Sequence, residues 1–131
     1  MNKNDIKELI QEAFNTRENS YAPYSKYSVG AVIVTKDNKI YKGCNIENGA
    51  YPSSICAERV ALFKALSEGE RDFKTIVIVS EGDMPYPCGE CRQVLSEFVN
   101  NDFMVIVATN KDSYEMFSFD QIMPLSFKRS K

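Results

Sequence analysis

Residues 75–99, TIVIVSEGDMPYPCGECRQVLSEFV, carry the clearest structural pattern in the chain. The first five residues form an apolar run of strand length, which is typical of a buried strand. A loop containing glycine and proline follows, from Gly82 to Pro87. Pro87 stands where a helix would begin, which predicts a helix from Cys88 to about Val99. The stretch therefore predicts a strand, a loop and a helix in succession.

Similar patterns continue on both sides of this stretch. Upstream, the sequence predicts helices at 5–14 and 56–67, strands at 27–35 and 40–45, and a turn at 36–39. Asp5 and Glu8 resemble a capping box for the first helix, and Gly69 suits the end of the second. Downstream, predicted strands at 103–108 and 114–119 precede one helical turn at 120–123. Strands that alternate with helices favour an α/β fold, here a three-layer α/β/α sandwich with a mixed central sheet of about five strands.

Length and composition predict one globular domain over residues 1–131. Hydrophobic residues make up 44% of the chain and charged residues 26%, which are ordinary shares for such a domain. The net charge is −2, and the one cluster of basic residues is the tail pair Lys128-Arg129, so nucleic-acid binding is not supported. The apolar runs are too short to cross a bilayer, and the N-terminus has no signal-peptide core. We therefore expect no membrane association and a cytoplasmic protein.

The cysteines call for a chemical explanation, because disulfides are rare in the cytoplasm. The chain has four cysteines and no histidine, which excludes Ser-His and Cys-His catalysis and every His-ligated metal site. Cys88 and Cys91 lie one helical turn apart on one face, and Cys56 begins the preceding helix. Backbone N–H groups and the helix dipole favour thiolates at such positions. Three thiolates on zinc leave one position for water, which is the mark of a catalytic site.

Glu58 is the candidate proton carrier of this site. It lies two residues after Cys56, in the first helical turn, where its carboxylate could face the water without binding the metal. Zinc lowers the pKa of a bound water to roughly 7, and a nearby carboxylate can take and return its proton. Without the cysteines beside it, Glu58 would be interpreted as a solvated helix residue.

Two other interpretations of the cysteines are weaker. A redox pair is disfavoured because Pro87 precedes Cys88, and Gly-Glu separates Cys88 from Cys91, unlike the usual redox dipeptide. A structural four-cysteine zinc site would need Cys44, which has no CxxC partner and lies on a predicted strand. Cys44 is therefore predicted to be a small core residue.

Two fragments match a known signature, Cys56-Ala57-Glu58 and Pro87-Cys88-Gly89-Glu90-Cys91. Zinc deaminases carry a His- or Cys-x-Glu fragment and a Pro-Cys-x-x-Cys fragment, with a glutamate that is not a ligand. More closely, the chain resembles the small homotetrameric cytidine deaminases. The matching positions run in the family's order over most of the chain: 21–25, 29–31, 43–48, Tyr51, 56–59, 87–93, Pro124 and Phe127.

The resemblance implies a cytidine deaminase-like fold and a hydrolase of pyrimidine salvage. Its reaction would convert cytidine and deoxycytidine to uridine and deoxyuridine plus ammonia. Cys56, Cys88 and Cys91 would hold one zinc ion per chain, and Glu58 would pass protons from water to ring N3 and then to departing ammonia. Arg59 would hydrogen-bond the thiolates, because three of them on one zinc ion leave a net charge of −1, which weakens the Lewis acid.

The resemblance also implies a set of residues that bind a small-molecule nucleoside: Tyr27, Asn45, Glu47, Tyr51, Ala57 and Phe127. The backbone of Ala57 would bond the pyrimidine. Asn45 and Glu47 would take the ribose hydroxyls, which suits an amide and a strong acceptor. Phe127 lies in an apolar tail and would reach the pyrimidine of an adjacent subunit in a homotetramer. The alternative is that Phe127 packs on its own domain.

The chain departs from the family at three positions. Tyr27 stands where phenylalanine is usual, Gly49 replaces an alanine, and Val32 replaces the second alanine after Gly30. The Tyr27 hydroxyl must find a hydrogen-bond partner. These departures bear on substrate preference and leave the predicted reaction unchanged.

Three other functions are compatible with part of the sequence. An enzyme resembling blasticidin S deaminase would share the zinc site, but residues 45–48, Asn-Ile-Glu-Asn, argue against it. A deaminase of nucleic acids would need basic or aromatic surfaces that the net charge of −2 does not support. A non-catalytic, zinc-stabilised binding module would keep the three cysteines but would have no need for Glu58.

Overall fold

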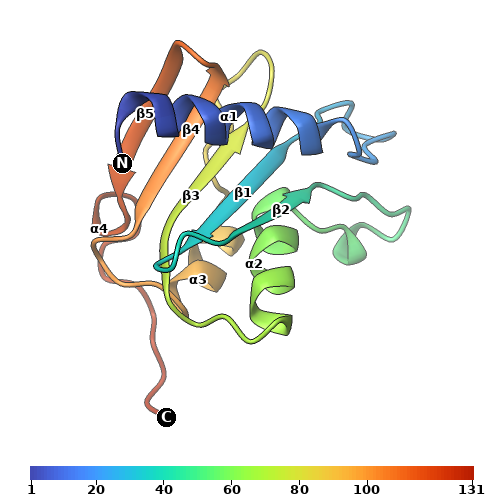
Figure 1. Cartoon of the computed structure of the whole chain (residues 1–131). Helices are drawn as coiled ribbons and strands as arrows, with labels where there is room; N and C mark the ends of the chain where they lie inside the picture. Colours follow the sequence, from blue (N-terminus) through green and yellow to red (C-terminus); the bar gives the residue numbers. More distant parts are fainter.

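A computed structural model describes the whole chain, Met1–Lys131. Its five strands form one sheet in the order β2-β1-β3-β4-β5 (Figure 1). They are β1 (Gly30–Thr35), β2 (Ile40–Cys44), β3 (Phe73–Val79), β4 (Met104–Asn110) and β5 (Ser113–Ser118). The β3–β4 pair is parallel and the other three pairs are antiparallel. The sheet is therefore mixed, as the sequence predicts.

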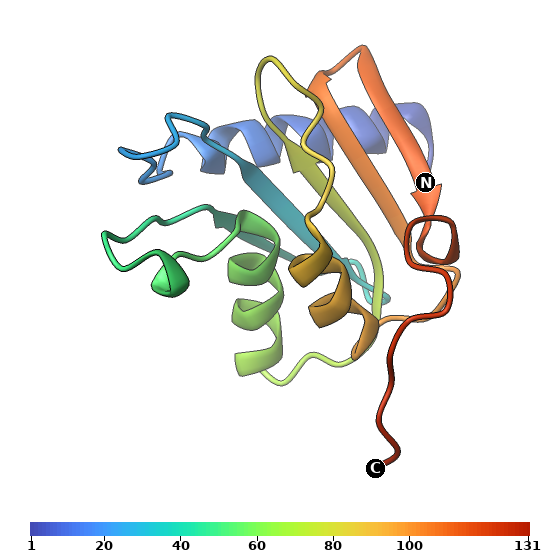
Figure 2. The same cartoon turned by 180° about the vertical axis from the view of Figure 1, so that it is seen from behind.

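Helices cover both faces of this sheet. The longest helix, α1 (Lys3–Arg17), crosses one face, whereas α2 (Ala57–Ser67) and α3 (Gly89–Ser96) lie side by side on the other (Figures 1 and 2). Two short elements, η1 (Tyr51–Ser53) and α4 (Phe119–Ile122), lie in the connections. The predicted three-layer α/β/α sandwich is confirmed. None of the helices combines the length and apolar character needed to cross a membrane.

Alternation along the central strands divides the core into two layers. In β3, Ile76 and Ile78 pack with α2 and α3, whereas Val77 and Val79 pack against α1. Successive side chains of a strand point to opposite faces, so a strand covered on both sides is apolar at every position. All four of these side chains are fully buried. The continuous apolar run that begins the 75–99 stretch is therefore the consequence of helices on both faces.

The boundaries of several predicted elements were wrong, each for a local reason. Asn2, not Asp5, caps α1: its side chain accepts from the Asp5 N–H at 2.9 Å, and the Asp5 carboxylate accepts from the Asn2 N–H at 3.3 Å. Strand β1 begins at Gly30, because the carbonyls of Tyr27 and Ser28 bond to side chains rather than to a neighbouring strand. Helix α3 ends at Ser96 instead of residue 99.

Gly43 brings α2 unusually close to the sheet. A Cβ atom at this position would lie 2.5 Å from the backbone N of Ala61 and 2.6 Å from the carbonyl O of Ala57. Both atoms belong to the α2 backbone and cannot move aside as a flexible side chain would. The absence of a side chain at Gly43 therefore sets the depth at which α2, and the residues at its start, rest on the sheet.

Candidate metal centre and active site

Three cysteine sulfurs gather where α2 and α3 begin. Cys56 is the N-cap of α2, Cys88 is the N-cap of α3, and Cys91 lies in the first turn of α3. Their Sγ atoms all lie within 4.8 Å of one another, and none forms a disulfide. Both N-cap residues have extended backbone, which turns the chain into each helix. The Cys88 Sγ accepts from the Cys91 N–H at 3.5 Å, whereas the Cys56 side chain makes no such capping bond.

The cluster fits a zinc ion. Tetrahedral zinc with Zn–S bonds of about 2.3 Å places two sulfurs roughly 3.8 Å apart, within the spread found here. Hydrogen bonding from Cys91, which outweighs burial, lowers the pKa of the Cys56 thiol to about 5. The same hydrogen bond, together with burial, raises the pKa of Cys91 above its ordinary value. A metal ion would take the place of the shared proton, since zinc binds thiolates and releases their protons.

Arg59 supplies positive charge beside the cluster. Its Nη2 lies 3.6 Å from Cys56 Sγ and 3.0 Å from Glu90 Oε2. The Arg59 Nε is buried without a hydrogen-bond partner. The Arg59 guanidinium therefore lies next to the Cys56 sulfur, as the sequence predicts, and it also forms an ion pair with the Glu90 carboxylate.

Glu58 is a buried carboxyl that points into the site rather than into solvent. Its residue is 5% exposed in the first turn of α2, although an unpaired glutamate is rarely buried. Burial, followed by repulsion from the Cys56 thiolate, raises its pKa to about 7. A carboxyl that titrates near neutral pH can both accept and return a proton. Glu58 is not among the three clustered ligands, and its role as the proton carrier stays a prediction.

These groups open into a pocket of about 250 Å³. Its lining residues are Ser25, Tyr27, Val29, Asn45, Glu47, Cys56, Ala57, Glu58, Pro85, Tyr86 and Cys88. The volume lies below the roughly 300–1,000 Å³ of sites for drug-sized ligands, so the pocket suits a small molecule. The structure brings together most of the predicted site residues. Sequence reasoning missed Ser25, Val29, Pro85 and Tyr86; the Gly/Pro loop before Cys88 was the available signal for the last two.

Most of the hydrogen-bonding capacity of the Asn45 side chain is used by bonds to other residues of the protein. Its Oδ1 accepts from the Ser20 hydroxyl at 2.6 Å and from the Val29 N–H at 2.9 Å, and its Nδ2 donates to the Tyr27 carbonyl at 2.8 Å. An amide offers two acceptor positions and two N–H donors. One N–H of Asn45 therefore remains for a ligand in the pocket.

Glu47 is also held in place. Its Oε1 accepts from the backbone N–H groups of Tyr24 and Ser25, at 2.9 and 3.1 Å, and its Oε2 accepts from the Ser25 hydroxyl. These hydrogen bonds, the Ser25 hydroxyl first, lower the pKa of Glu47. Glu47 is therefore a fixed, negatively charged acceptor at one end of the pocket.

Two of the predicted nucleoside-binding residues, Tyr51 and Phe127, lie outside this pocket within one chain. Tyr51 lines a neighbouring hollow together with Glu47, and its ring meets that of Tyr24 edge-on at 6.1 Å. Phe127 is 67% exposed in the tail that leaves the body of the domain (Figures 1 and 2). Its carbonyl accepts from Gln93 at 3.0 Å. The role of Phe127 in an adjacent subunit stays a prediction.

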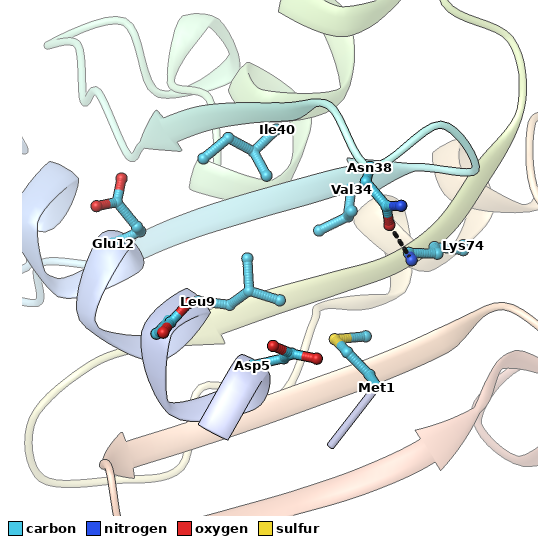
Figure 3. Close-up of a pocket in the computed structure, with 9 residues that line it drawn as sticks. Met1, Asp5, Leu9, Glu12, Val34, Asn38, Ile40 and Lys74 are labelled. Atoms are coloured by element: carbon cyan, nitrogen blue, oxygen red, sulfur yellow. Dashed lines mark hydrogen bonds between the residues drawn. The ribbon is translucent and has the colours of Figure 1, made fainter. Parts of the chain in front are cut away.

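A larger hollow, of about 610 Å³, lies between α1 and the β1–β2 hairpin (Figure 3). Its walls combine the carboxylates of Asp5, Glu8 and Glu12 with apolar side chains such as Leu9 and Ile40. It contains no cysteine and none of the groups with shifted pKa values. The chemistry of the lining therefore identifies the smaller pocket as the candidate active site.

Comparisons with known proteins agree with this site. Residues 3–107 match the family described as the cytidine and deoxycytidylate deaminase zinc-binding region. The chain is 44% identical to a cytidine deaminase of Sporosarcina psychrophila, over 95% of this chain and 93% of the relative. It is 31% identical to a blasticidin-S deaminase of Bacillus cereus, over 81% of each chain.

The fold is also similar to that of a solved structure. The crystal structure of a cytidine deaminase from Burkholderia pseudomallei superposes with a TM-score of 0.87 at 41% identity, covering 92% of this chain and 97% of that one. The matching zinc-binding region and the cluster of Cys56, Cys88 and Cys91 fit one zinc ion per chain. The chain belongs to the family of cytidine and deoxycytidylate deaminases.

Proposed function

We propose that the protein is a zinc-dependent cytidine deaminase, which hydrolyses cytidine and deoxycytidine to uridine and deoxyuridine with release of ammonia. One observation carries the proposal: Cys56, Cys88 and the buried carboxyl Glu58 line a single small pocket, and the third clustered thiol, Cys91, lies within 4.8 Å of the other two sulfurs. A cytidine deaminase of Sporosarcina psychrophila at 44% identity supports the substrate class.

The cysteines hold the metal and Arg59 moderates their charge. Zinc in such a site supplies Lewis acidity, which makes water acidic enough to serve as a nucleophile near neutral pH. Cys56, Cys88 and Cys91 contribute three negative charges, so the site keeps a net −1 when zinc is bound. The Arg59 guanidinium, 3.6 Å from Cys56 Sγ, offsets part of this charge.

Glu58 moves the protons of the reaction. Its carboxylate takes a proton from the attacking water and gives it to ring N3 of the cytosine. It then takes the second proton, from the hydroxyl newly bonded to C4, and gives it to the amino group, which leaves as ammonia when the C4–N bond breaks. A pKa raised to about 7 by burial lets the same group act as base and acid near neutral pH. Exclusion of solvent around Glu58 also keeps these protons from exchanging with bulk water.

The sugar is recognised at the other end of the pocket. The free N–H of Asn45 donates to a ribose oxygen, and the Glu47 carboxylate accepts from a ribose hydroxyl. The Ala57 backbone bonds the pyrimidine, and Tyr27 lines the wall beside it. This arrangement favours an unphosphorylated sugar, because the charge of Glu47 opposes a phosphate.

Blasticidin S-type deamination is the second candidate, and the relative from Bacillus cereus at 31% identity favours it. Asn45 and Glu47, which hydrogen bonds fix in place, favour a substrate with a ribose instead. A non-catalytic zinc module would have no reason to bury Glu58 beside the cysteines, since burying a carboxyl costs stability.

The proposed enzyme is a single domain over residues 1–131 that works in cytoplasmic pyrimidine salvage as a homotetramer. One continuous sheet with a core on each face supports the single domain. Large apolar side chains left exposed around the pocket and in the tail, among them Tyr51, Tyr86 and Phe127, support assembly. In the tetramer, Phe127 closes the pocket of an adjacent subunit.

Glu58→Gln tests the proton carrier. The amide keeps the shape of the side chain but cannot exchange protons, so kcat for cytidine should fall by about 10²-fold or more. Zinc content, measured by elemental analysis, should stay at one per chain. The exposed Glu68→Gln serves as the matched control and should keep full turnover. Near-normal kcat in zinc-loaded Glu58→Gln would show that another group carries the proton.

The sugar assignment is tested by comparing cytidine with its monophosphate. A phosphate next to the fixed Glu47 carboxylate meets like charge, so kcat/KM should be about 10-fold higher for the nucleoside than for the monophosphate. Ammonia release measures both substrates in the same assay. Equal kcat/KM values would mean that Glu47 does not face the sugar.

Light scattering and a tail variant together test the assembly. The protein should run as a tetramer, and Phe127→Ala should raise KM for cytidine while zinc content stays at one per chain. Lys128→Ala is the matched control, because Lys128 is an exposed, charged residue of the same tail. A monomer that deaminates cytidine at full rate would contradict both the shared pocket and the role of Phe127.

A further inference from the structure

The segment between β3 and α3, residues 80–88, forms one wall of the pocket and is here called the 80–88 loop. It contributes Pro85, Tyr86 and the candidate ligand Cys88 to the lining. The loop contains no helix or strand, and Gly82 adopts a left-handed φ of 88°. Its position over the pocket therefore depends on bonds to neighbouring segments.

Side chains tie the beginning of this loop to Ser28 and to the last residue of α1, Arg17. The Ser80 hydroxyl donates to the Ser28 carbonyl at 2.8 Å, and Arg17 pairs with Glu81 at 3.5 Å. Both bonds lie next to the end of β3. Further along, the Tyr86 hydroxyl donates to Glu115 on β5 at 2.7 Å, which ties the loop to the edge strand of the sheet.

A second bond between the 25–29 segment and the 80–88 loop comes from a residue that lines the pocket. The Tyr27 hydroxyl donates to the backbone carbonyl of Asp83 at 3.0 Å, while the Tyr27 ring lines the pocket. The carbonyl partner is independent of the side chain at position 83. Tyr27 itself is anchored, because its own carbonyl accepts from Asn45 Nδ2 at 2.8 Å. Phenylalanine, usual in the family at this position, would keep the ring and lose the bond.

We propose that Tyr27 is a positioning residue whose hydroxyl holds the 80–88 loop against the 25–29 segment and thereby sets how closely the pocket surrounds the pyrimidine nucleoside. The inference rests on the proposed function for the identity of the ligand. The Tyr27 ring lines the pocket, whereas the Tyr27 hydroxyl has a separate role: it holds the loop that carries Tyr86 and Cys88 close to the pocket.

The expected effect is on binding more than on chemistry. A hydrogen bond between neutral groups changes an equilibrium by about 2- to 10-fold. Tyr27→Phe should therefore raise KM for cytidine about 2- to 10-fold and leave kcat within about twofold, because zinc, Glu58 and the cysteines are untouched. Tyr41→Phe is the matched control: its hydroxyl donates to Glu70 at 2.7 Å, and Tyr41 lines none of the cavities.

The position of the 80–88 loop can be measured without substrate, by limited proteolysis. A glutamate-specific protease cuts after Glu81, within the 80–88 loop, and mass spectrometry can compare that cut with one after the exposed Glu18. Loop tips that open are cut faster. Tyr27→Phe should accelerate the cut after Glu81 relative to Glu18 about 2- to 10-fold, at an unchanged melting temperature, and Tyr41→Phe should not.

Both shifts are required. An unchanged cut after Glu81 in Tyr27→Phe would show that the hydroxyl does not hold the loop, and an unchanged KM would show that the loop does not set the fit of the nucleoside. Either result overturns the inference while leaving the proposed function intact. A zinc-loaded wild-type protein that leaves cytidine untouched would instead contradict the proposed function.

Discussion

The site depends on one constraint: two helices must begin next to each other, with a cysteine at each start. Only then do Cys56, Cys88 and Cys91 bring their sulfurs within 4.8 Å. The sheet provides this arrangement, because β1 and β3 are neighbours and α2 and α3 pack on the same face. Gly43 also contributes, because its lack of a side chain lets the α2 backbone lie directly against β2.

Electrostatic interactions explain which charged residues lie around the three cysteine sulfurs. Three thiolates concentrate negative charge in a partly buried place, so a neighbouring cation is needed and Arg59 is present. The same burial keeps the Glu58 proton bound until about neutral pH. Glu47 is the opposite case, since three donors hold it as an anion at the exposed end of the pocket. The two carboxyl groups are thus prepared for different tasks by their environments.

Sequence patterns predict what depends on local spacing. The apolar run at 75–79, the cysteine spacing and the position of Glu58 after Cys56 were sufficient for the layers, the sheet and the core of the site. They could not reveal that Asn45 is mostly occupied by Ser20, Val29 and Tyr27, because those bonds join separate segments. Pro85 and Tyr86 were missed for a similar reason: the Gly/Pro loop before Cys88 signals a connection next to a ligand, but it has no periodicity from which the direction of its side chains could be predicted.

Zinc coordination is the central claim, and X-ray absorption at the zinc edge measures it most directly. The purified protein should show three sulfur neighbours at about 2.3 Å and one lighter neighbour at about 2.0–2.2 Å. That shell leaves one position for chemistry beside Glu58. Four sulfur neighbours would mean that Cys44 joins the others in a closed structural site, and the account of a catalytic centre would be wrong.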